Sequence, residues 1–341
     1  MNTSDFFYDL PPELIAQTPA AERAASRLLI YNRSTQSVTD GVFSDITNHL
    51  HAGDVLVRNT TRVIPARLIG TREQTGGHME FLLLRRTEGD RWECLAKPAR
   101  RARPGQEYCV GEELCVRILG DTAAEGGKLV EMRYEGVFEE VLERVGQTPL
   151  PPYITERLDD PERYQTVYAR ERGSAAAPTA GLHFTEALLE QLRAQGVQIV
   201  DVLLHVGLGT FRPVTAERVE DHHMHAEYCE VTEEAARRIN AARACGGRIV
   251  AVGTTTVRTL ESAAAPDGQV RPFAGQTDIF ITPGYRFRAV DALITNFHLP
   301  GSTLLMLVSA LAGREEMLRA YRHAVQERYR FFSFGDAMLI E

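Results

Sequence analysis

Three short apolar segments of this chain each lead into a loop of glycines, hydroxyl side chains and a histidine, and then into a predicted helix. They are Val200–Pro213, Ile249–Leu260 and Ala292–Leu304, and the loop Gly173–Thr185 leads into a helix in the same way. In an open parallel sheet such loops lie together at the carboxyl ends of the strands, where ligands bind. Helix N-termini there offer free N–H groups and a partial positive charge. The sequence therefore predicts one composite ligand site of backbone, small side chains and imidazoles.

Three histidines fall at equivalent places in these segments. His183, His205 and His298 each stand at the end of a predicted strand or just before a helix. Imidazole titrates near neutral pH, so these positions suit proton transfer. The alternative for each ring is that it only ties a loop to a backbone carbonyl. Their recurrence in different segments argues against a purely structural role for all three.

Small and hydroxylated residues occupy the same loops. Residues 175–181 read Ala-Ala-Ala-Pro-Thr-Ala-Gly, and such small side chains let a flat ligand approach the backbone, although tight packing selects the same residues. Three threonines, residues 254–256, follow Gly253 at a predicted helix start. One of them suits an N-cap, and the others are placed to reach a ribose or a carboxylate.

Further polar residues extend this pattern. Asn296 and Ser302 follow the third apolar segment, and helix capping is the alternative role for Ser302. Two aromatic rings that can stack on a base, and an amide beside them, occur at Tyr164, Tyr168 and Gln165. Because the two tyrosines are at helical spacing, a place in the core or at its rim suits them better.

The sequence lacks the motifs of several large enzyme classes. Gly207 and Gly209 form a G-x-G, but Arg212 replaces the third glycine of the dinucleotide fingerprint. The sequence contains no G-x-x-x-x-G-K-[ST] phosphate loop and no G-x-S-x-G nucleophile elbow. These absences argue against a NAD dehydrogenase, a nucleoside triphosphatase and an α/β-hydrolase.

A histidine-rich segment raises the question of a metal site. In an extended backbone His223, His225 and Glu227 would project to one face, and two imidazoles with a carboxylate can bind a transition metal. The Cys/His spacing that is typical of zinc is absent. We therefore expect no metal, and a hydrogen-bonding or surface role for this segment.

The composition is that of a globular protein with room for two domains. The chain has 341 residues, 44% of them hydrophobic and 25% charged. No apolar run approaches the roughly 20 residues of a membrane helix, and the first residues do not resemble a signal peptide. The five cysteines form no C-x-x-C pair and are odd in number, so we expect free thiols in a cytoplasmic protein.

The charge distribution gives a mixed indication about nucleic acid. The net charge of −8 argues weakly against a nucleic-acid partner. Lys97, Arg100, Arg101 and Arg103 nevertheless place four cations within seven residues, with no acid among them. A solvated loop is the simpler interpretation of this run, and a phosphate contact is the alternative.

The pattern of predicted strands and helices changes twice along the chain. Between residues 66 and 149 short β-like runs alternate with glycine-rich turns, which is typical of a small barrel or sandwich. Elsewhere buried strands alternate with helices, for two of which Thr185 and Thr232 are the predicted N-caps. We therefore predict the α/β class: residues 1–65 and 150–341 form a large domain with a mixed or parallel sheet, into which the β-rich domain is inserted.

Taken together, the motifs are specific enough to indicate a family. They are Tyr164–Ala169, Ala176–Phe184, Leu204–Pro213, residues 224–228, Val252–Ser262, Asp291–Ser309 and Tyr329–Ile340, with Asp5–Pro19 and Asn59–Leu68. The sequence resembles the S-adenosylmethionine:tRNA ribosyltransferase-isomerase family of queuosine biosynthesis. The resemblance spans essentially the whole chain and is weakest over residues 71–145.

The resemblance implies a fold and a reaction. The family fold is a large α/β domain with an inserted small β-barrel. The reaction transfers and isomerises the ribosyl group of S-adenosylmethionine onto 7-aminomethyl-7-deazaguanine at the wobble position of tRNA. Its products are epoxyqueuosine-tRNA, adenine and methionine. S-adenosylmethionine is a consumed substrate, no metal or further cofactor is required, and we expect a monomer without membrane contact.

The roles of single residues are our own hypotheses. For proton transfer we expect His183, His205, His225 and His298, with Glu227 either orienting an imidazole or recognising the ammonium group. The residues expected to bind the substrate are Tyr164, Gln165, Pro178, Thr179, Gly181, Gly207, Gly209, Thr210, Gly253, Thr254, Thr255, Arg258, Asn296 and Ser302. The cations Lys97, Arg100, Arg101 and Arg103 are expected to bind tRNA phosphates.

Two alternatives from other functional classes stay open. A tRNA-binding protein without catalysis would release adenine no faster than the background, and the imidazole-rich loops argue against it. A methyltransferase that uses S-adenosylmethionine on RNA would produce S-adenosylhomocysteine. The absence of a glycine-rich cofactor loop argues against this second alternative.

Overall fold

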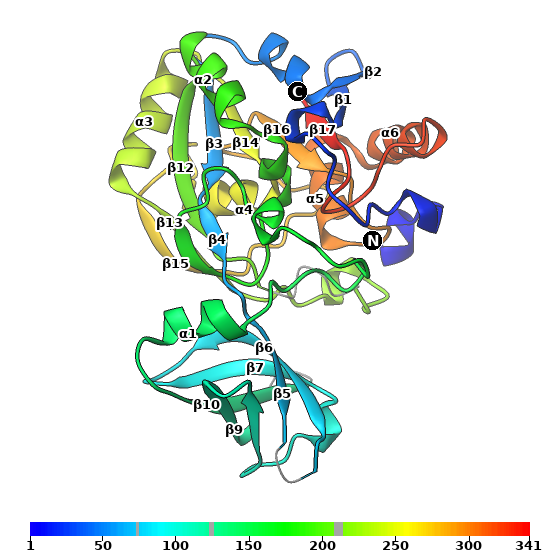
Figure 1. The fold of residues 1–341 in the computed structure, drawn as a ribbon. Helices are drawn as coiled ribbons and strands as arrows, with labels where there is room; N and C mark the ends of the chain where they lie inside the picture. Colours follow the sequence, from blue (N-terminus) through cyan, green and yellow to red (C-terminus); the bar gives the residue numbers. More distant parts are fainter. Residues whose placement is uncertain (73–74, 123–125, 208–213) are drawn as a thin grey trace. The chain divides into compact units, whose positions relative to one another are not determined.

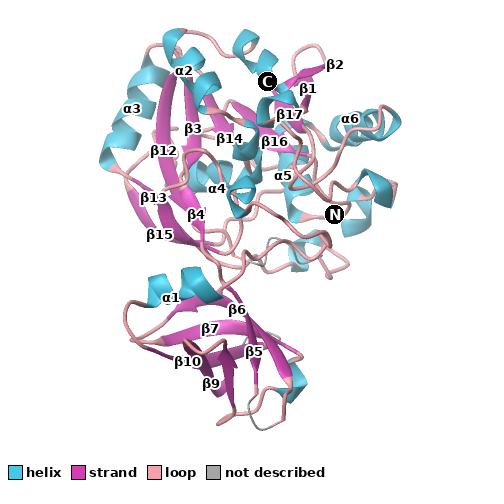
Figure 2. Cartoon of the chain, in the orientation of Figure 1, coloured by secondary structure: helices cyan, strands magenta, loops and turns pink. Residues whose placement is uncertain are grey.

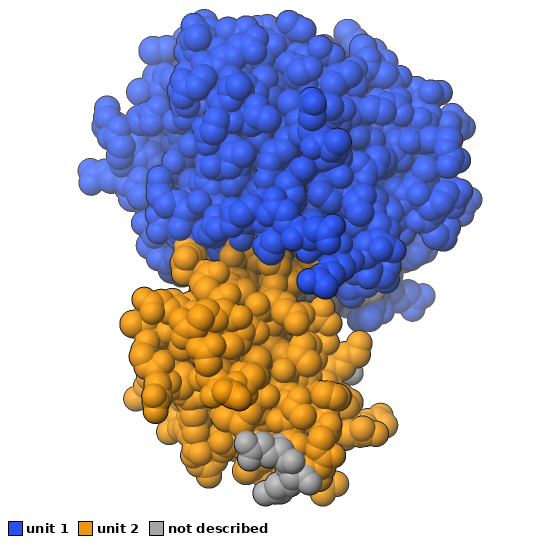
Figure 3. Space-filling view, viewed as in Figure 1, with its two compact units in different colours: residues 1–62, 152–171, 177–341 blue, residues 63–151, 172–176 orange. Residues whose placement is uncertain are grey.

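The protein divides into two compact units in the computed structural model, which describes residues 1–72, 75–122, 126–207 and 214–341 (Figure 1). Unit 1 comprises Met1–Arg62, Pro152–Glu171 and Ala177–Glu341, and unit 2 comprises Val63–Pro151 and Arg172–Ala176 (Figure 3). The predicted class, α/β with an added β-barrel, is confirmed.

Unit 1 is built on a mixed sheet of nine strands (Figure 2). In spatial order these are β15 (Phe273–Thr277), β13 (Glu227–Val231), β12 (Gln198–Leu204), β3 (Val55–Asn59), β14 (Ile249–Val252), β16 (Ala292–Asn296), β17 (Ala337–Ile340), β1 (Arg27–Asn32) and β2 (Ser37–Val42). The four central strands β12, β3, β14 and β16 are mutually parallel. The loops that follow them therefore leave the sheet at one edge, as the sequence predicts.

Helices cover both faces of this sheet, which explains why β14 and the first three residues of β3 and β16 are apolar. The α-helices of unit 1 are α2 (Glu186–Ala194), α3 (Glu233–Ala244), α4 (Thr254–Ala263), α5 (Thr303–Ala312) and α6 (Arg314–Gln326). In β3, Val55 and Val57 pack into the core cluster that contains α3, α4, α5 and α6, whereas Leu56 packs into the cluster on the α2 side. Successive side chains of a strand point to opposite faces, so neighbouring residues are apolar where helices cover both faces, whereas the polar Arg58 and Asn59 end the strand.

Short polar side chains fix the starts of these helices. Thr185 accepts a hydrogen bond from the Leu188 N–H and Thr232 one from the Ala235 N–H, each at 3.2 Å, which confirms both predicted caps. For α4 the expected threonine cap is wrong. Gly253 is the N-cap there, at a φ of 85° that favours glycine, and it leaves the threonine hydroxyls free for other contacts.

Several 3-10 helices connect the main elements. They span Thr3–Phe6, Pro12–Leu14, Arg23–Ala25, Phe43–Asn48, Ala99–Arg101, Pro161–Tyr164, Thr179–His183 and Val219–Asp221. A separate two-stranded sheet pairs β4 (Thr61–Val63) with β11 (Glu171–Ser174). Among the described helices, none has both the length and the apolar character to cross a membrane.

Unit 2 is a closed six-stranded barrel, which decides between the two predicted β architectures. Its strands are β5 (Arg67–Thr71), β6 (His78–Arg86), β7 (Arg91–Lys97), β8 (Glu107–Val110), β9 (Leu114–Asp121) and β10 (Gly127–Tyr134), and it carries helix α1 (Phe138–Val145). Buried and partly exposed residues alternate along these strands, so one face of every strand fills the barrel interior.

The prediction that all cysteines are free thiols is wrong for one pair. Cys109 on β8 and Cys115 on β9 form a disulfide. The antiparallel register places the two residues directly opposite each other, and no sequence motif marks such a pairing. Cys94 and Cys229 are buried free thiols, and Cys245 is exposed.

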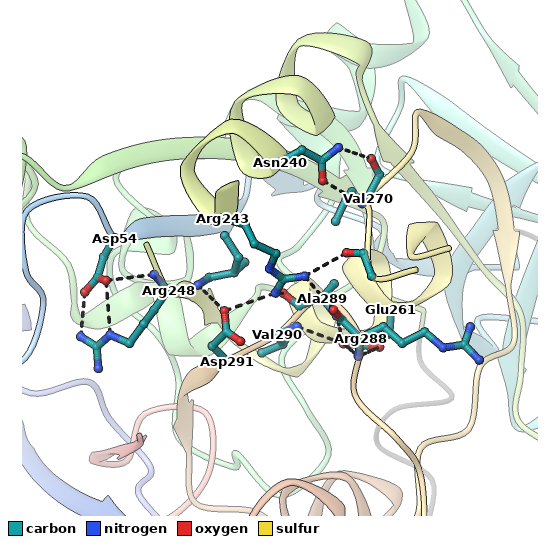
Figure 4. Close-up of polar contacts among 12 residues, drawn as sticks. Asp54, Asn240, Arg243, Arg248, Glu261, Val270, Arg288, Ala289, Val290 and Asp291 are labelled. Atoms are coloured by element: carbon teal, nitrogen blue, oxygen red, sulfur yellow. Dashed lines mark hydrogen bonds and ion pairs between the residues drawn. The ribbon is translucent and has the colours of Figure 1, made fainter. Parts of the chain in front are cut away.

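A buried carboxylate ties α4 to the segment that precedes β16 (Figure 4). Glu261 accepts hydrogen bonds from the backbone N–H groups of Arg288, Ala289 and Val290 at 3.0–3.1 Å and from the Tyr285 hydroxyl at 2.9 Å. The side chain of Glu261 is buried, so water does not replace it as the acceptor for these hydrogen bonds. The carboxylate thereby fixes the distance between the helix that begins at Thr254 and the strand that ends at Asn296.

A second group of ionic contacts holds the starts of the central strands (Figure 4). Asp291 accepts a hydrogen bond from the Ile249 N–H at 2.8 Å and forms an ion pair with Arg243 at 3.2 Å. Arg248 forms an ion pair with the buried carboxylate of Asp54 at 2.7 Å. The starts of β3, β14 and β16 are thus clamped together, and their registers fix where the carboxyl ends lie.

We expect Glu261→Ala to lower the free energy of unfolding by about 3 kcal/mol, because three buried N–H groups would lose their acceptor. Urea unfolding measures this change. The matched control is Glu190→Ala on α2, where an exposed carboxylate pairs with Arg193; a loss of about 0.5 kcal/mol or less is expected there. Equal losses in the two variants would contradict the role given to Glu261.

Candidate functional site

The loops at the carboxyl ends of β14 and β16 line a pocket in unit 1. Its empty volume is about 680 Å³. The chain contributes to the lining at residues 177–180, at residues 253–255 after β14, at residues 295–299, 302 and 304 at and after the end of β16, and at Phe332 and Ser333. The pocket therefore lies where the sequence predicts a composite ligand site.

The start of α4 presents polar groups to this pocket. Gly253, Thr254 and Thr255 all line it. The Thr255 hydroxyl oxygen is buried and has no hydrogen-bond partner among the described residues. The first N–H groups of a helix lack intrahelical acceptors and carry a partial positive charge. This edge of the pocket can therefore donate hydrogen bonds to a carboxylate or a ribose oxygen.

Asn296, at the end of β16, joins three segments of the chain. Its Oδ1 accepts a hydrogen bond from the Thr179 hydroxyl at 3.0 Å. Its Nδ2 donates to His183 Nε2 at 3.1 Å and to the Phe332 carbonyl at 3.2 Å. Because the amide donates to it, His183 Nε2 must be an unprotonated acceptor, which places the ring proton on Nδ1, 2.7 Å from the Ser26 hydroxyl.

Both histidines near this pocket are neutral at physiological pH. Burial, and next the charges of Arg23 and Arg330, lower the pKa of His183 to about 3. Burial alone lowers the pKa of His298 to about 3. His298 lines the pocket and its Nε2 lies 2.9 Å from the Thr295 hydroxyl. The pocket wall is therefore polar but carries no histidine charge.

A second group of predicted residues gathers around Glu227, and none of them is in the pocket lining. One carboxylate oxygen of Glu227 accepts the Gly207 N–H at 2.7 Å, and the other forms a buried ion pair with Arg258. His225 Nε2 lies 3.5 Å from Glu227 Oε1. Burial would raise the pKa of Glu227, but the neighbouring His225 and Arg258 outweigh it and hold the pKa below its usual range.

The third of the strand-end histidines lies in neither group. His205 Nδ1 is 2.8 Å from the Thr61 hydroxyl, and burial lowers the pKa of the ring. Val206, the next residue, lines the pocket. The loop that continues from Gly207 contains Gly209 and Thr210, which lie outside the described residues.

The structure brings together about half of the residues predicted to bind substrate. Those that line the pocket are Pro178, Thr179, Gly253, Thr254, Thr255, Asn296 and Ser302. Ser302 also caps α5 through the Leu305 N–H, so its alternative role is confirmed. Tyr164 is fully buried, packed edge-on against Phe334, and Gln165 is buried beside it.

Gly181 is required for packing rather than for ligand approach. A Cβ at this position would lie 2.1 Å from the Tyr168 hydroxyl oxygen, so no larger residue fits there without displacing the ring.

Three residues of the lining lie outside the four loop segments from which the sequence predicts the site. Tyr153, Phe332 and Ser333 all face the pocket, and the Tyr153 hydroxyl lies 2.7 Å from Ser333 Oγ. Phe332 has a φ of 71°, a conformation that is rare for a bulky side chain and marks functional positions. Only the family motif Tyr329–Ile340 signals the last two in the sequence.

His223, His225 and Glu227 are not among the described residues whose ligand atoms lie close enough together to hold a metal ion. Within the described residues, the grouping of possible ligand atoms comprises Glu107, Cys109 and Cys115. Both of these cysteines are in the disulfide and offer no thiolate.

This chain is similar to known proteins over its whole length. A family model described as "Queuosine biosynthesis protein" matches residues 3–340. The S-adenosylmethionine:tRNA ribosyltransferase-isomerases of Symbiobacterium thermophilum and Thermoanaerobacter sp. are 62% and 58% identical to this chain, and each alignment covers 100% of both proteins. The crystal structure of S-adenosylmethionine tRNA ribosyltransferase from Thermotoga maritima is similar, with a TM-score of 0.58 and 40% identity over 99% of this chain and 100% of that chain.

The neutral histidines predict an acid-sensitive fold. Because the folded pKa of His298 is about 3, below the value of 6.5 expected when unfolded, its contribution is complete above pH 6.5 and is lost as the pH falls toward 3. Between pH 7 and pH 5 the loss is about 2 kcal/mol. Urea unfolding at the two pH values should therefore show a smaller loss for His298→Gln than for the wild type.

The exposed His78 on β6 provides the control for this measurement. We expect His78→Gln to lose as much stability on acidification as the wild type. An unchanged pH dependence in His298→Gln would contradict the neutral state assigned to His298.

Proposed function

This chain belongs to the queuosine biosynthesis protein family, and on that premise we propose that it acts as an S-adenosylmethionine:tRNA ribosyltransferase-isomerase. It transfers and isomerises the ribosyl moiety of S-adenosylmethionine onto 7-aminomethyl-7-deazaguanine at the wobble position of tRNA. The products are epoxyqueuosine-tRNA, adenine and methionine. The observation that carries the proposal is the full-length match to relatives of that name at 57–62% identity. The cytoplasmic location and the monomeric state stay predictions.

The pocket at the ends of β14 and β16 is our proposed site for S-adenosylmethionine. The sulfonium of this substrate is a cation, and the neutral His183 and His298 do not repel it as imidazolium ions would. The methionine carboxylate and the ribose hydroxyls find hydrogen-bond partners in the N–H groups at the start of α4 and in the Thr255 hydroxyl. Apolar neighbours such as Phe332 and Leu299 provide contact area for a flat base.

The reaction requires three proton movements. A base removes a proton from the 5′-methylene carbon beside the sulfonium to give an ylide, adenine leaves more easily when its ring is protonated, and the aminomethyl nitrogen must lose a proton before it attacks. We assign His298 first, because it is the histidine that lines the pocket among the described residues. His183, His205 and His225 remain candidates.

The Glu227 group is proposed to act by positioning. Its carboxylate holds the Gly207 N–H at the start of the loop that follows β12, next to Val206 in the pocket wall. The ion pair with Arg258 fixes the carboxylate to α4. Glu227 and Arg258 therefore connect this loop to the helix whose first turn faces the substrate.

One assay tests the proposed function. The protein is incubated with S-adenosylmethionine and tRNA that carries 7-aminomethyl-7-deazaguanine, and the products are separated by chromatography. We expect adenine and methionine in equal amounts. Production of S-adenosylhomocysteine would instead indicate a methyltransferase, and adenine at the background rate would indicate a binding protein without catalysis.

Thr255→Val locates the reaction in the pocket within the same assay. The substitution removes a hydroxyl that has no hydrogen-bond partner among the described residues and keeps the shape of the side chain, so we expect the KM for S-adenosylmethionine to rise about tenfold. Ser309→Ala is the matched control, because its hydroxyl on α5 is also buried with no partner in the described part of the chain, but it does not line the pocket. Equal kinetics in the two variants would exclude this pocket.

The cations Lys97, Arg100, Arg101 and Arg103 are proposed to bind tRNA phosphates. Lys97 ends β7, Arg100 and Arg101 lie in the short 3-10 helix Ala99–Arg101, and Arg103 follows that helix; all four are exposed. We expect reversal of the three arginine charges to weaken tRNA binding and to flatten the dependence of log Kd on log salt, since about 0.9 counterions are released per phosphate contact. Unchanged affinity at both 50 and 300 mM salt would refute this role.

A further inference from the structure

A second, smaller pocket of unit 1 is lined by two arginines. Arg23 and Arg163 line it together with Ser26, His183 and Phe334. It shares Ser333 with the larger pocket. The hydrogen bond from Asn296 to His183 joins the linings of the two pockets.

The two guanidinium groups are held by neutral acceptors. Arg23 donates to the Leu182 carbonyl at 3.0 Å and to the Glu162 carbonyl at 2.9 Å. Arg163 donates to the carbonyls of Ala20 and Ala21. In the part of the chain that the structure describes, neither forms an ion pair with a carboxylate. The backbone carbonyls therefore fix the direction of both guanidiniums without neutralising their charges.

The acids around this pocket are engaged elsewhere. The Glu162 carboxylate pairs with Arg62, and Asp160 accepts the Glu162 N–H at 3.0 Å. Asp336 accepts the backbone N–H groups of Arg27 and Arg330. None of these carboxylates takes either guanidinium of the pocket as a hydrogen-bond partner.

Like charges lie close together at this place. Burial, followed by the repulsion from Arg163, lowers the pKa of Arg23, although the charges of Asp160 and Glu162 act in the opposite direction. The Arg163 Nε atom is buried without a partner among the described residues. Arg330, which donates to the Thr18 carbonyl, adds a third positive charge that acts on His183.

We propose that Arg23 and Arg163 bind a backbone phosphate of the RNA substrate in this smaller pocket. The inference rests on the proposed function, which supplies RNA as the substrate. Two guanidiniums offer parallel N–H donors that match phosphate oxygens, and a bound phosphate relieves the repulsion between them. The carboxylate of S-adenosylmethionine is not the expected anion, because that molecule has its own hydrogen-bond donors at the start of α4.

Salt-dependent RNA binding tests this inference. The Kd for the substrate tRNA is measured between 50 and 300 mM KCl for the wild type, for the double variant Arg23→Gln/Arg163→Gln and for Arg163→Lys. Loss of one phosphate contact should lower the slope of log Kd against log salt by about 0.9 and raise the Kd about tenfold at physiological salt. Arg163→Lys keeps the charge and should retain most of the slope.

Arg237→Gln is the matched control, because Arg237 is exposed on α3 and paired with Glu234. It should bind tRNA like the wild type. Circular dichroism checks folding, and if the double variant is unfolded, Arg163→Gln alone decides by the same criteria. The Kd for S-adenosylmethionine, measured by calorimetry without RNA, should stay within twofold of the wild type.

The remaining outcomes separate this inference from the proposed function. An unchanged salt slope in the folded arginine variants overturns the phosphate site and leaves the proposed function intact. If the slope is unchanged and the Kd for S-adenosylmethionine rises, the arginines bind the carboxylate of that substrate, and the phosphate site is overturned. A wild type that releases no adenine from S-adenosylmethionine and tRNA overturns the proposed function itself.

Discussion

The side-chain amide of Asn296 makes three hydrogen bonds, to Thr179, to His183 and to the Phe332 carbonyl, and the larger pocket depends on them. Two of these partners lie more than 110 residues away in the sequence. An amide offers both acceptor and donor atoms, so it can satisfy a hydroxyl, an imidazole and a carbonyl at once. Buried polar networks of this kind specify one arrangement, because any partner left unpaired in a low-dielectric interior is costly. The same bonds also fix which nitrogen of His183 carries its proton.

The position of Asn296 follows from the sheet. β14 and β16 are parallel, and their starts are held by Asp291 and by the carboxylate of Glu261. The carboxyl ends are therefore fixed side by side, which brings the first turn of α4 next to the loop that contains His298. The pocket is thus a consequence of strand register and of the ion pairs at the far end of the strands.

The two pockets of unit 1 differ in charge, and the difference suits two parts of the proposed reaction. The larger pocket is lined by hydroxyls, an amide and the neutral His298, which tolerate a sulfonium cation. The smaller pocket contains two arginines whose guanidiniums are hydrogen-bonded to backbone carbonyls, which suits an anion. His183 lines the smaller pocket and is hydrogen-bonded to Asn296 in the wall of the larger one. Its ring is neutral because burial and the positive charges of Arg23 and Arg330 both lower its pKa.

The sequence by itself determined the local features of this protein. The helix caps at Thr185 and Thr232, the apolar central strands and the pocket positions of Thr254, Thr255, Asn296 and His298 all follow from residue type and periodicity. The tertiary structure decided which distant side chains meet. Tyr153 faces Ser333 across 180 residues, Cys109 pairs with Cys115 through strand register, and His225 and Glu227 join Arg258 away from the pocket lining. Periodicity encodes the face on which a residue lies, but contact between remote segments depends on how strands pair and how the core packs.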